Sequence, residues 1–113
     1  MEFFKNIEPF YWVEHEDCFS VCLEPGDYKA ELFAKRSDDG FEGNGYDWES
    51  LAEAFLNEKM PEALDIINFD PEADLFCAYS DDEQMLKKFA LQFKRACEDE
   101  SLIEEIFSKA EIN

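Results

Sequence analysis

Basic residues are scarce in this sequence. Its 113 residues include 10 lysines and arginines but 29 aspartates and glutamates, which gives a formal net charge of −19. A surface of this sign repels nucleic acids and anionic membranes, and it attracts basic proteins. Small domains stay soluble with a net charge of only about 2 to 8 in magnitude, so solubility alone does not explain the excess. We therefore expect neither a nucleic acid nor a membrane as partner, and we favour a basic protein.

Residues that serve catalysis or bind metals are also few. His15 is the only histidine, and the sequence pairs no serine or cysteine with it, so a catalytic role rests on no positive feature. No Cys-x-x-Cys spacing indicates zinc. Two of the four cysteines lie four residues apart on a predicted strand and share a face, and we interpret all four as reduced thiols that act as small core side chains. They are Cys18, Cys22, Cys77 and Cys97. The sequence thus predicts no disulfide, no zinc, no cofactor and no enzymatic activity.

Long hydrophobic runs are missing too. No stretch approaches the roughly 18 apolar residues of a membrane helix. The start, Met-Glu-Phe-Phe-Lys-Asn, has no basic region followed by an apolar run. We therefore expect a cytoplasmic monomer, with residues 1–113 in one domain. Aromatic residues are abundant instead: 12 phenylalanines, four tyrosines and two tryptophans can fill a core, and they argue against intrinsic disorder.

Only four glycines are present, and two of them, Gly43 and Gly45, lie in the segment Phe-Glu-Gly-Asn-Gly-Tyr-Asp-Trp (residues 41–48). A P-loop would need Lys-Ser or Lys-Thr at its end, and a dinucleotide-binding loop would need three spaced glycines after a strand. Neither pattern is present, and the net charge repels phosphate. We interpret the segment as a tight loop that exposes Tyr46 and enters a helix capped by Asp47.

The hydrophobic pattern predicts an α+β fold, in which an antiparallel sheet of about five strands has two to three helices packed on it. The predicted strands are residues 10–15, 18–23, 28–36, 64–69 and 75–79, and the predicted helices are residues 47–59, residues 81–97 and a short helix from residue 101. Residues 28–36 are ambiguous, because their alternation fits a strand while their alanines, glutamate, leucine and lysines also favour a helix. We prefer the strand.

Helix starts and core positions follow from the same pattern. Ser80 and Ser101 each precede a glutamate by three residues, which is the spacing of a capping box. Phe55, Phe89 and Phe93 lie on the apolar faces of the two longest predicted helices. We therefore predict that the two serines cap helices and that the three phenylalanines are buried.

Several motifs resemble those of a known family. They are Gly-Asn-Gly-Tyr-Asp-Trp-Glu-Ser-Leu-Ala (residues 43–52), Glu-Lys-Met-Pro (58–61), Phe-Asp-Pro-Glu-Ala (69–73) and Phe-Cys-Ala-Tyr-Ser (76–80). From about residue 40 to the end, the chain resembles the immunity protein 51 family, bacterial proteins that are encoded beside polymorphic toxins and protect cells from them. The resemblance implies an α+β fold, no enzymatic activity and a toxin as partner. It names no contact residues.

The connections between the predicted elements are rich in acidic residues. Counting helix and strand directions along the chain places four acidic connections at the same pole as the glycine loop. We predict that this pole, with Tyr46 as an aromatic anchor, binds the partner. The predicted contact residues are Glu16, Asp17, Asp38, Asp39, Glu42, Tyr46, Asp70, Glu72, Asp74, Glu98, Asp99 and Glu100. The opposite pole should hold only Glu24, Asp27, Glu62, Asp81 and Asp82 near its turns. The alternative is that these connections are acidic simply because the whole protein is.

Three functions remain open at this point. The first is an immunity protein that neutralises a basic toxin, for example a nuclease, and the second is an acidic adaptor or nucleic-acid mimic that sequesters a basic regulator. The third is a small enzyme of unknown type. Asp70, Glu72 and Asp74 are spaced like the first ligands of a calcium loop, but Leu75 stands where that loop needs glycine. We therefore interpret this segment as a hairpin tip.

Overall fold

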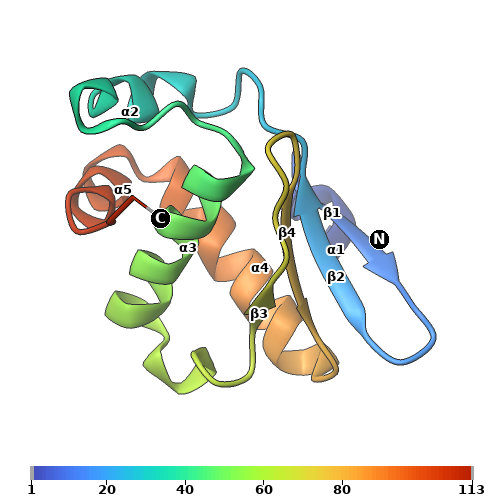
Figure 1. Ribbon diagram of the computed structural model, residues 1–113. Coiled ribbons are helices and arrows are strands. Elements are labelled where there is room, and N and C mark those ends of the chain that lie inside the picture. The colour runs from blue at the N-terminus through green and yellow to red at the C-terminus, as the bar shows by residue number, and fades with distance from the viewer. Residues whose placement is uncertain (1, 113) are drawn as a thin grey trace.

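The computed structural model describes residues 2–112 and contains an antiparallel sheet with helices packed on it (Figure 1). The elements are α1 (Glu2–Asn6), β1 (Tyr11–Glu14), β2 (Phe19–Leu23), α2 (Ala30–Ala34), η1 (Ser37–Asp39), α3 (Gly45–Lys59), η2 (Pro61–Ala63), β3 (Asn68–Phe69), β4 (Phe76–Ser80), α4 (Glu83–Glu98) and α5 (Glu100–Phe107), where η marks a 3-10 helix. The expected α+β class is confirmed, with four strands instead of about five and, within the described residues, five α-helices instead of two to three. Over the same residues, no helix has the length and apolar character needed to span a bilayer.

The strand order is β1-β2-β4-β3, and every neighbouring pair is antiparallel. β1 and β2 form the expected hairpin. β2 then pairs with β4, so that Leu23 lies opposite Phe76 at one end of the strands and Phe19 lies opposite Ser80 at the other. α3 and α4 both contact the sheet, and α1 packs beside α4. The helices therefore cover one face of the sheet, as Figure 1 shows.

Trp48, in the first turns of α3, lies at the centre of an aromatic core. It is fully buried, and its ring stacks parallel to that of Tyr28 at a centroid distance of 5.9 Å. The rings of Phe10, Phe33 and Phe93 surround it at 5.7, 5.2 and 6.1 Å. Such clusters combine a large buried apolar area with favourable ring geometry. α3 is consequently an interior helix, with nine of its fifteen residues buried.

The three phenylalanines predicted to be buried are in this core. Phe55, Phe89 and Phe93 are at most 2% exposed. The rings of Phe89 and Phe93 stack 5.2 Å apart, and Phe55 lies 5.2 Å from Phe93. The helix faces assigned from the sequence are therefore correct.

The strand predicted at residues 28–36 was wrong, because Ala30–Ala34 form the helix α2. Leu32 and Phe33 are both buried, although consecutive side chains on a strand point to opposite faces. The Phe33 ring lies 5.1 Å from that of Phe107 on α5, so α2 is packed on another helix. Tertiary packing and the helix-forming residues together override the alternating pattern.

The strand expected at residues 64–69 is reduced to β3, Asn68–Phe69. Pro61 opens a 3-10 helix, and the chain stays coiled because the N–H groups of Ile66 and Ile67 both donate to the carbonyl of Ala63 at 2.9 Å. Only the last two residues of the segment are extended enough to pair with β4.

The two serine caps were assigned to the wrong residues. Asp82 caps α4 and Asp99 caps α5, each accepting a hydrogen bond from the N–H three residues further on. Ser80 cannot cap because it is still paired within β4; its hydroxyl instead accepts from the N–H of Asp82 at 3.0 Å. α4 and α5 follow each other so closely that Asp99 ends one and begins the other, which places Ser101 inside α5.

Candidate functional site

The connection between β3 and β4 packs against the first turn of α3 (Figure 1). It is closed by mutual backbone hydrogen bonds of 2.7 and 3.1 Å between Glu72 and Leu75. The Gly45 N–H donates to the carbonyl of Ala73 at 3.0 Å. A Cβ at Gly45 would collide with the carbonyl oxygens of Glu72 and Leu75, so only glycine fits there. Close backbone approach, and not phosphate binding, accounts for this glycine.

Asp47 anchors the loop before α3, and its expected role as the N-cap was wrong. Asn44 has the extended backbone of a cap, and its side-chain oxygen accepts from the Asp47 N–H at 2.9 Å. The buried Asp47 carboxylate accepts from the N–H groups of Glu42 and Gly43 at 2.6 and 2.9 Å. The helix therefore begins at Gly45, and Asp47 ties the preceding loop to it.

Five of the predicted contact residues come together here, and we call them the tip surface: Glu42, Tyr46, Asp70, Glu72 and Asp74. All five are exposed, and Tyr46 presents 46% of its surface to solvent. Within residues 2–112, none of these four carboxylates forms an ion pair. Their uncompensated charge produces a local negative potential around an exposed aromatic ring.

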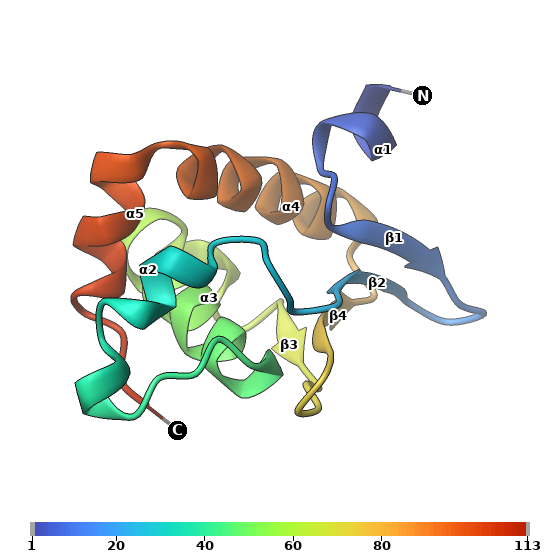
Figure 2. The same cartoon turned by 90° about the horizontal axis from the view of Figure 1, so that it is seen from above.

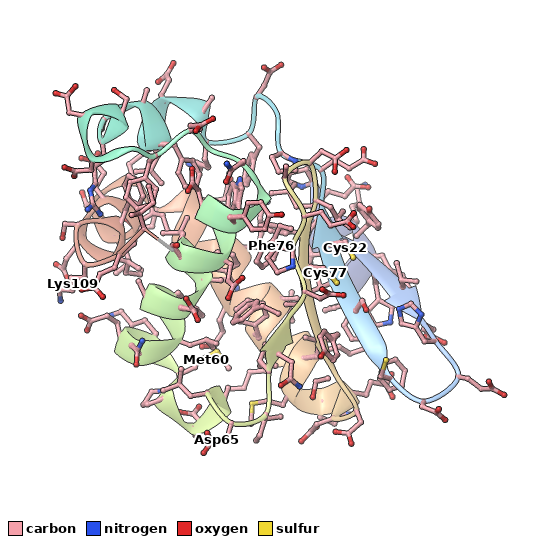
Figure 3. All side chains as sticks on the ribbon, in the orientation of Figure 1. Cys22, Met60, Asp65, Phe76, Cys77 and Lys109 are labelled. Atoms are coloured by element: carbon pink, nitrogen blue, oxygen red, sulfur yellow. The ribbon has the colours of Figure 1, made fainter. Side chains whose placement is uncertain are left out.

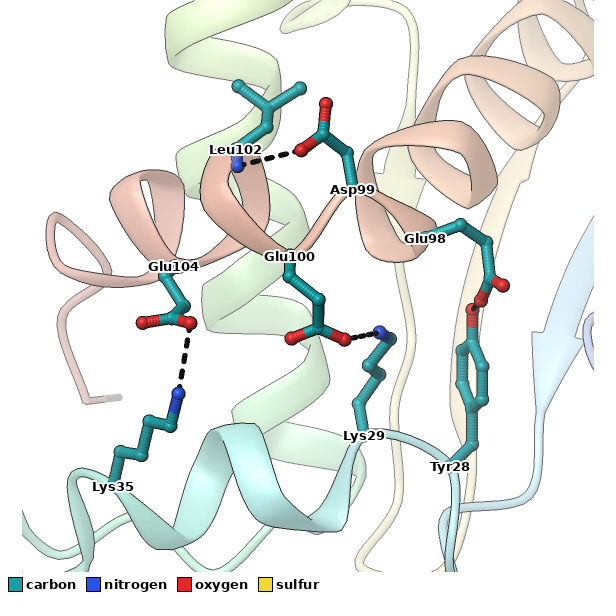
Figure 4. Close-up of polar contacts among 8 residues, drawn as sticks. All are labelled: Tyr28, Lys29, Lys35, Glu98, Asp99, Glu100, Leu102 and Glu104. Atoms are coloured by element: carbon teal, nitrogen blue, oxygen red, sulfur yellow. Dashed lines mark hydrogen bonds and ion pairs between the residues drawn. The ribbon is translucent and has the colours of Figure 1, made fainter.

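Glu98, Asp99 and Glu100, at the α4–α5 junction, are engaged within the molecule (Figure 4). The Tyr28 hydroxyl donates to Glu98 at 2.6 Å, and the Lys29 ammonium pairs with Glu100 at 3.0 Å. Asp99 caps α5. The bond from Tyr28 holds the pKa of Glu98 below its ordinary value. The junction therefore uses its acidic side chains to hold the segment that leads into α2.

Asp38 and Asp39 lie in η1, which the structure places beside the C-terminal segment. Asp39 pairs with Arg36 at 2.9 Å, and the same guanidinium donates to the carbonyls of Phe107 and Ala110 at 2.6 and 2.7 Å. This connection is separate from the tip surface.

Glu16 and Asp17 lie at the opposite end of the sheet from the tip surface, contrary to the prediction. Their turn precedes β2 at Phe19, beside Ser80, whereas the tip precedes β4 beside the end of β2. Figure 2 shows the β1–β2 turn projecting away from α2 and α5. The prediction counted the direction of each element along the chain, and it failed for this turn because residues 28–36 were taken as a strand. For the same reason Glu24, expected at the other pole, follows β2 next to the tip.

The outer face of the sheet is a second feature, which the sequence did not indicate as a site. Its side chains line a shallow hollow to which no helix contributes: Val13, His15, Cys18, Ser20, Cys22, Asp70, Leu75, Cys77 and Tyr79. His15 Nε2 lies 2.9 Å from the Ser20 hydroxyl. Cys18 and Cys77 are partly exposed here, so their expected place in the core was wrong, whereas Cys22 and Cys97 are buried. Pairing the alternating residues of β2 and β4 would have revealed this row, but the sequence alone does not give the register.

The described residues were also compared with the usual arrangements of metal ligands. Among the described residues, no group of three or more histidine, cysteine, aspartate or glutamate side chains is arranged to hold a metal ion. Asp70, Glu72 and Asp74, which are spaced like the first ligands of a calcium loop, therefore do not form such a group.

The family comparison matches the model of immunity protein 51 to residues 10–112. The chain belongs to the immunity protein 51 family. The match covers β1 through α5 and therefore includes both the tip surface and the outer sheet face. No curated protein and no solved structure matches the chain. Membership indicates an immunity function against a toxin.

Proposed function

We propose that this chain binds and neutralises a cognate toxin domain with a basic surface, and that the tip surface makes the first and most specific contact. The observation that carries the proposal is membership of an immunity-protein family across residues 10–112. The net charge of −19 supports a basic partner. Many basic proteins, nucleases among them, use lysine and arginine to hold phosphate backbones, and an acidic inhibitor competes for the same groups.

The tip surface suits this role because its charges are unpaired and its backbone is fixed. The Asp47 carboxylate accepts a hydrogen bond from the Glu42 N–H. The Gly45 N–H donates to the carbonyl of Ala73 and so holds the β3–β4 connection against α3. A preorganised surface loses little conformational freedom when it binds. Tyr46 adds an aromatic side chain of the kind that is enriched among residues that dominate interface energies.

The proposed mechanism is electrostatic steering followed by close contact. Complementary potentials raise association rates by roughly 10 to 10³ at low salt, and the gain falls as salt screens the charges. The tip surface would then cover the basic groups that the toxin needs for its own substrate. This account requires no reaction by the immunity protein itself.

The test is co-expression with the toxin domain encoded by the neighbouring gene. We expect the two chains to co-purify and cells to survive expression of the toxin domain only when this chain is present. Survival should be lost when Tyr46, Glu72 and Asp74 are all replaced by alanine in a chain that still folds. A chain that captures a nucleic-acid-binding regulator and leaves toxicity unchanged would instead support the adaptor function and refute the proposal.

A further inference from the structure

Cys22 on β2 and Cys77 on β4 lie directly opposite each other in the antiparallel register. The Asp70 N–H donates to the Cys77 carbonyl at 3.0 Å, so the polar backbone groups of Cys77 point toward β3 and away from β2. Cys22 and Cys77 therefore form a non-hydrogen-bonded pair, the kind in which the Cα atoms are only about 4.5 Å apart and the side chains are closest. A disulfide needs a Cα separation of about 4.4 to 6.8 Å, a range that includes the typical separation of such pairs.

Both thiols are on the outer face of the sheet, as Figure 3 shows: Phe76 points toward the helices, and its neighbour Cys77 lies on the other side with Cys22. They line the same hollow, in which Cys77 is partly exposed and Cys22 is only 6% exposed. A small reagent can therefore reach Cys77 first. Hydrogen bonds from Cys22 and Ser20 stabilise the thiolate and lower the pKa of Cys77 to about 7.

We propose that Cys22 and Cys77 form a redox-sensitive dithiol that low-molecular-weight disulfides convert into a cross-strand disulfide. The Cys77 sulfur attacks one sulfur of the oxidant, whose S–S bond breaks and releases one thiol. Cys22 then loses its proton and attacks the Cys77 sulfur, which releases the second thiol. The two protein thiols give up two electrons and two protons in total, and the oxidant is reduced to two thiols.

The other two cysteines lack this arrangement. Cys97 is fully buried in α4, out of reach of a reagent. Cys18 precedes β2 and lies opposite His15, whose N–H donates to its carbonyl at 2.9 Å. The structure thus assigns the reaction to one pair of the four cysteines, all of which are free thiols in the structure.

The experiment treats the reduced, full-length chain with glutathione disulfide and follows its intact mass and its thiol count after denaturation. We expect the loss of two hydrogen atoms with no lasting glutathione adduct, a fall from four thiols to two, and a linked Cys22–Cys77 peptide after digestion. Cys22→Ser should stop at a stable glutathione adduct on Cys77. The lowered pKa of Cys77 should make its first step faster than that of an ordinary thiol at pH 7.

Matched variants make the result decisive. Cys18→Ser should behave as wild type, and Cys77→Ser should neither form the link nor react quickly. Retention of all four thiols at saturating oxidant, a link that includes Cys18, or a lasting adduct on Cys77 in the wild-type chain would each overturn the proposal. So would formation of the link only in denaturant, because the native register would then not be its cause.

Discussion

The tip surface and the α4–α5 junction are both acidic and both were predicted to bind the partner, but their carboxylates are used differently. At the junction, Glu98 accepts from Tyr28, Glu100 pairs with Lys29 and Asp99 caps α5. At the tip surface, within residues 2–112, no carboxylate has a basic partner. The difference is one of neighbours, because the segment leading into α2 brings the Tyr28 hydroxyl and the Lys29 ammonium to the junction.

The comparison teaches that acidic composition does not identify which charges are available to a partner. A carboxylate that already accepts a hydrogen bond must lose that bond before it can serve a new partner, and the loss offsets part of the gain. Uncompensated charges on a fixed backbone carry no such penalty. The predictions below change one region and leave the other intact.

The largest effect should come from the core that supports both regions. Phe93→Ala removes a ring packed against Trp48 and Phe55, and should lower the free energy of unfolding by about 3–5 kcal/mol in a urea melt. Phe4→Ala, at a ring that is 40% exposed, is the control and should change stability far less. Equal effects would mean that the core is assigned wrongly.

A smaller effect should come from breaking the tip surface without altering its charges. Gly45→Ala forces the backbone of Glu72 and Leu75 away from α3, and should lower stability by about 1–3 kcal/mol and weaken partner binding. Gly26→Ala is the matched control, because a Cβ there meets no atom within 4 Å. It should change stability by less than about 0.5 kcal/mol. Wild-type stability and binding in Gly45→Ala would show that the tip is not fixed in this way.

Loss of the hydrogen bond between Tyr28 and Glu98 at the junction should lower the stability of the protein in a pH-dependent way. Tyr28→Phe removes the hydroxyl that donates to Glu98 and should lower stability by about 1 kcal/mol at pH 7. Because the folded pKa of Glu98 is depressed, this contribution is present above the unfolded pKa, near 4.3, and is lost as the pH falls through the folded value. The stability difference between variant and wild type, measured in urea at pH 7 and pH 3, should therefore shrink at the lower pH. The same stability difference at both pH values would show that the ionisation of Glu98 does not contribute to the effect.

An effect of similar size separates the two candidate caps of α5. Asp99→Ala should cost about 1 kcal/mol, because the Leu102 N–H loses its acceptor at 3.2 Å. Ser101→Ala should change stability by less than about 0.5 kcal/mol. Thermal melts of the two single variants decide the assignment. A larger loss of stability in Ser101→Ala than in Asp99→Ala would show that Ser101 is the cap.

Much of the fold could be predicted from local patterns. The hairpin at β1–β2 and the faces of α3 and α4 follow from periodicity, which reports burial directly. α2 could not be assigned, because alternation over Tyr28 to Lys35 is compatible with either structure and packing against Phe107 decided it. Caps were misplaced by up to three residues, since sequence does not show where a strand such as β4 stops pairing.

The candidate site could be predicted only in part. Tyr46 and the residues from Asp70 to Asp74 were placed together correctly with the glycine loop, because α3 ends where predicted and the chain, although β3 is short, returns antiparallel to β4. Glu16 and Asp17 were misplaced because residues 28–36 were taken as a strand. That one error reversed the predicted direction of every strand before α2. Intramolecular partners such as Tyr28 for Glu98 are long-range contacts and leave no local pattern in the sequence.

The most direct test of the central claim is a comparison of association rates for two charge reversals of equal size. One set replaces the carboxylates of the tip surface by lysine: Glu42, Asp70, Glu72 and Asp74. The control set replaces Glu16, Asp17, Asp65 and Asp81, which are exposed and lie toward the other end of the molecule (Figure 3).

Rates are measured by stopped flow against the co-purifying toxin domain at several salt concentrations. The tip set should slow association at low salt by a factor of about 10 to 10³ and flatten its salt dependence, while the control set should have a much smaller effect. Equal slowing by both sets would contradict the account, because the acidity would then act as a general field and the tip surface would not be a site.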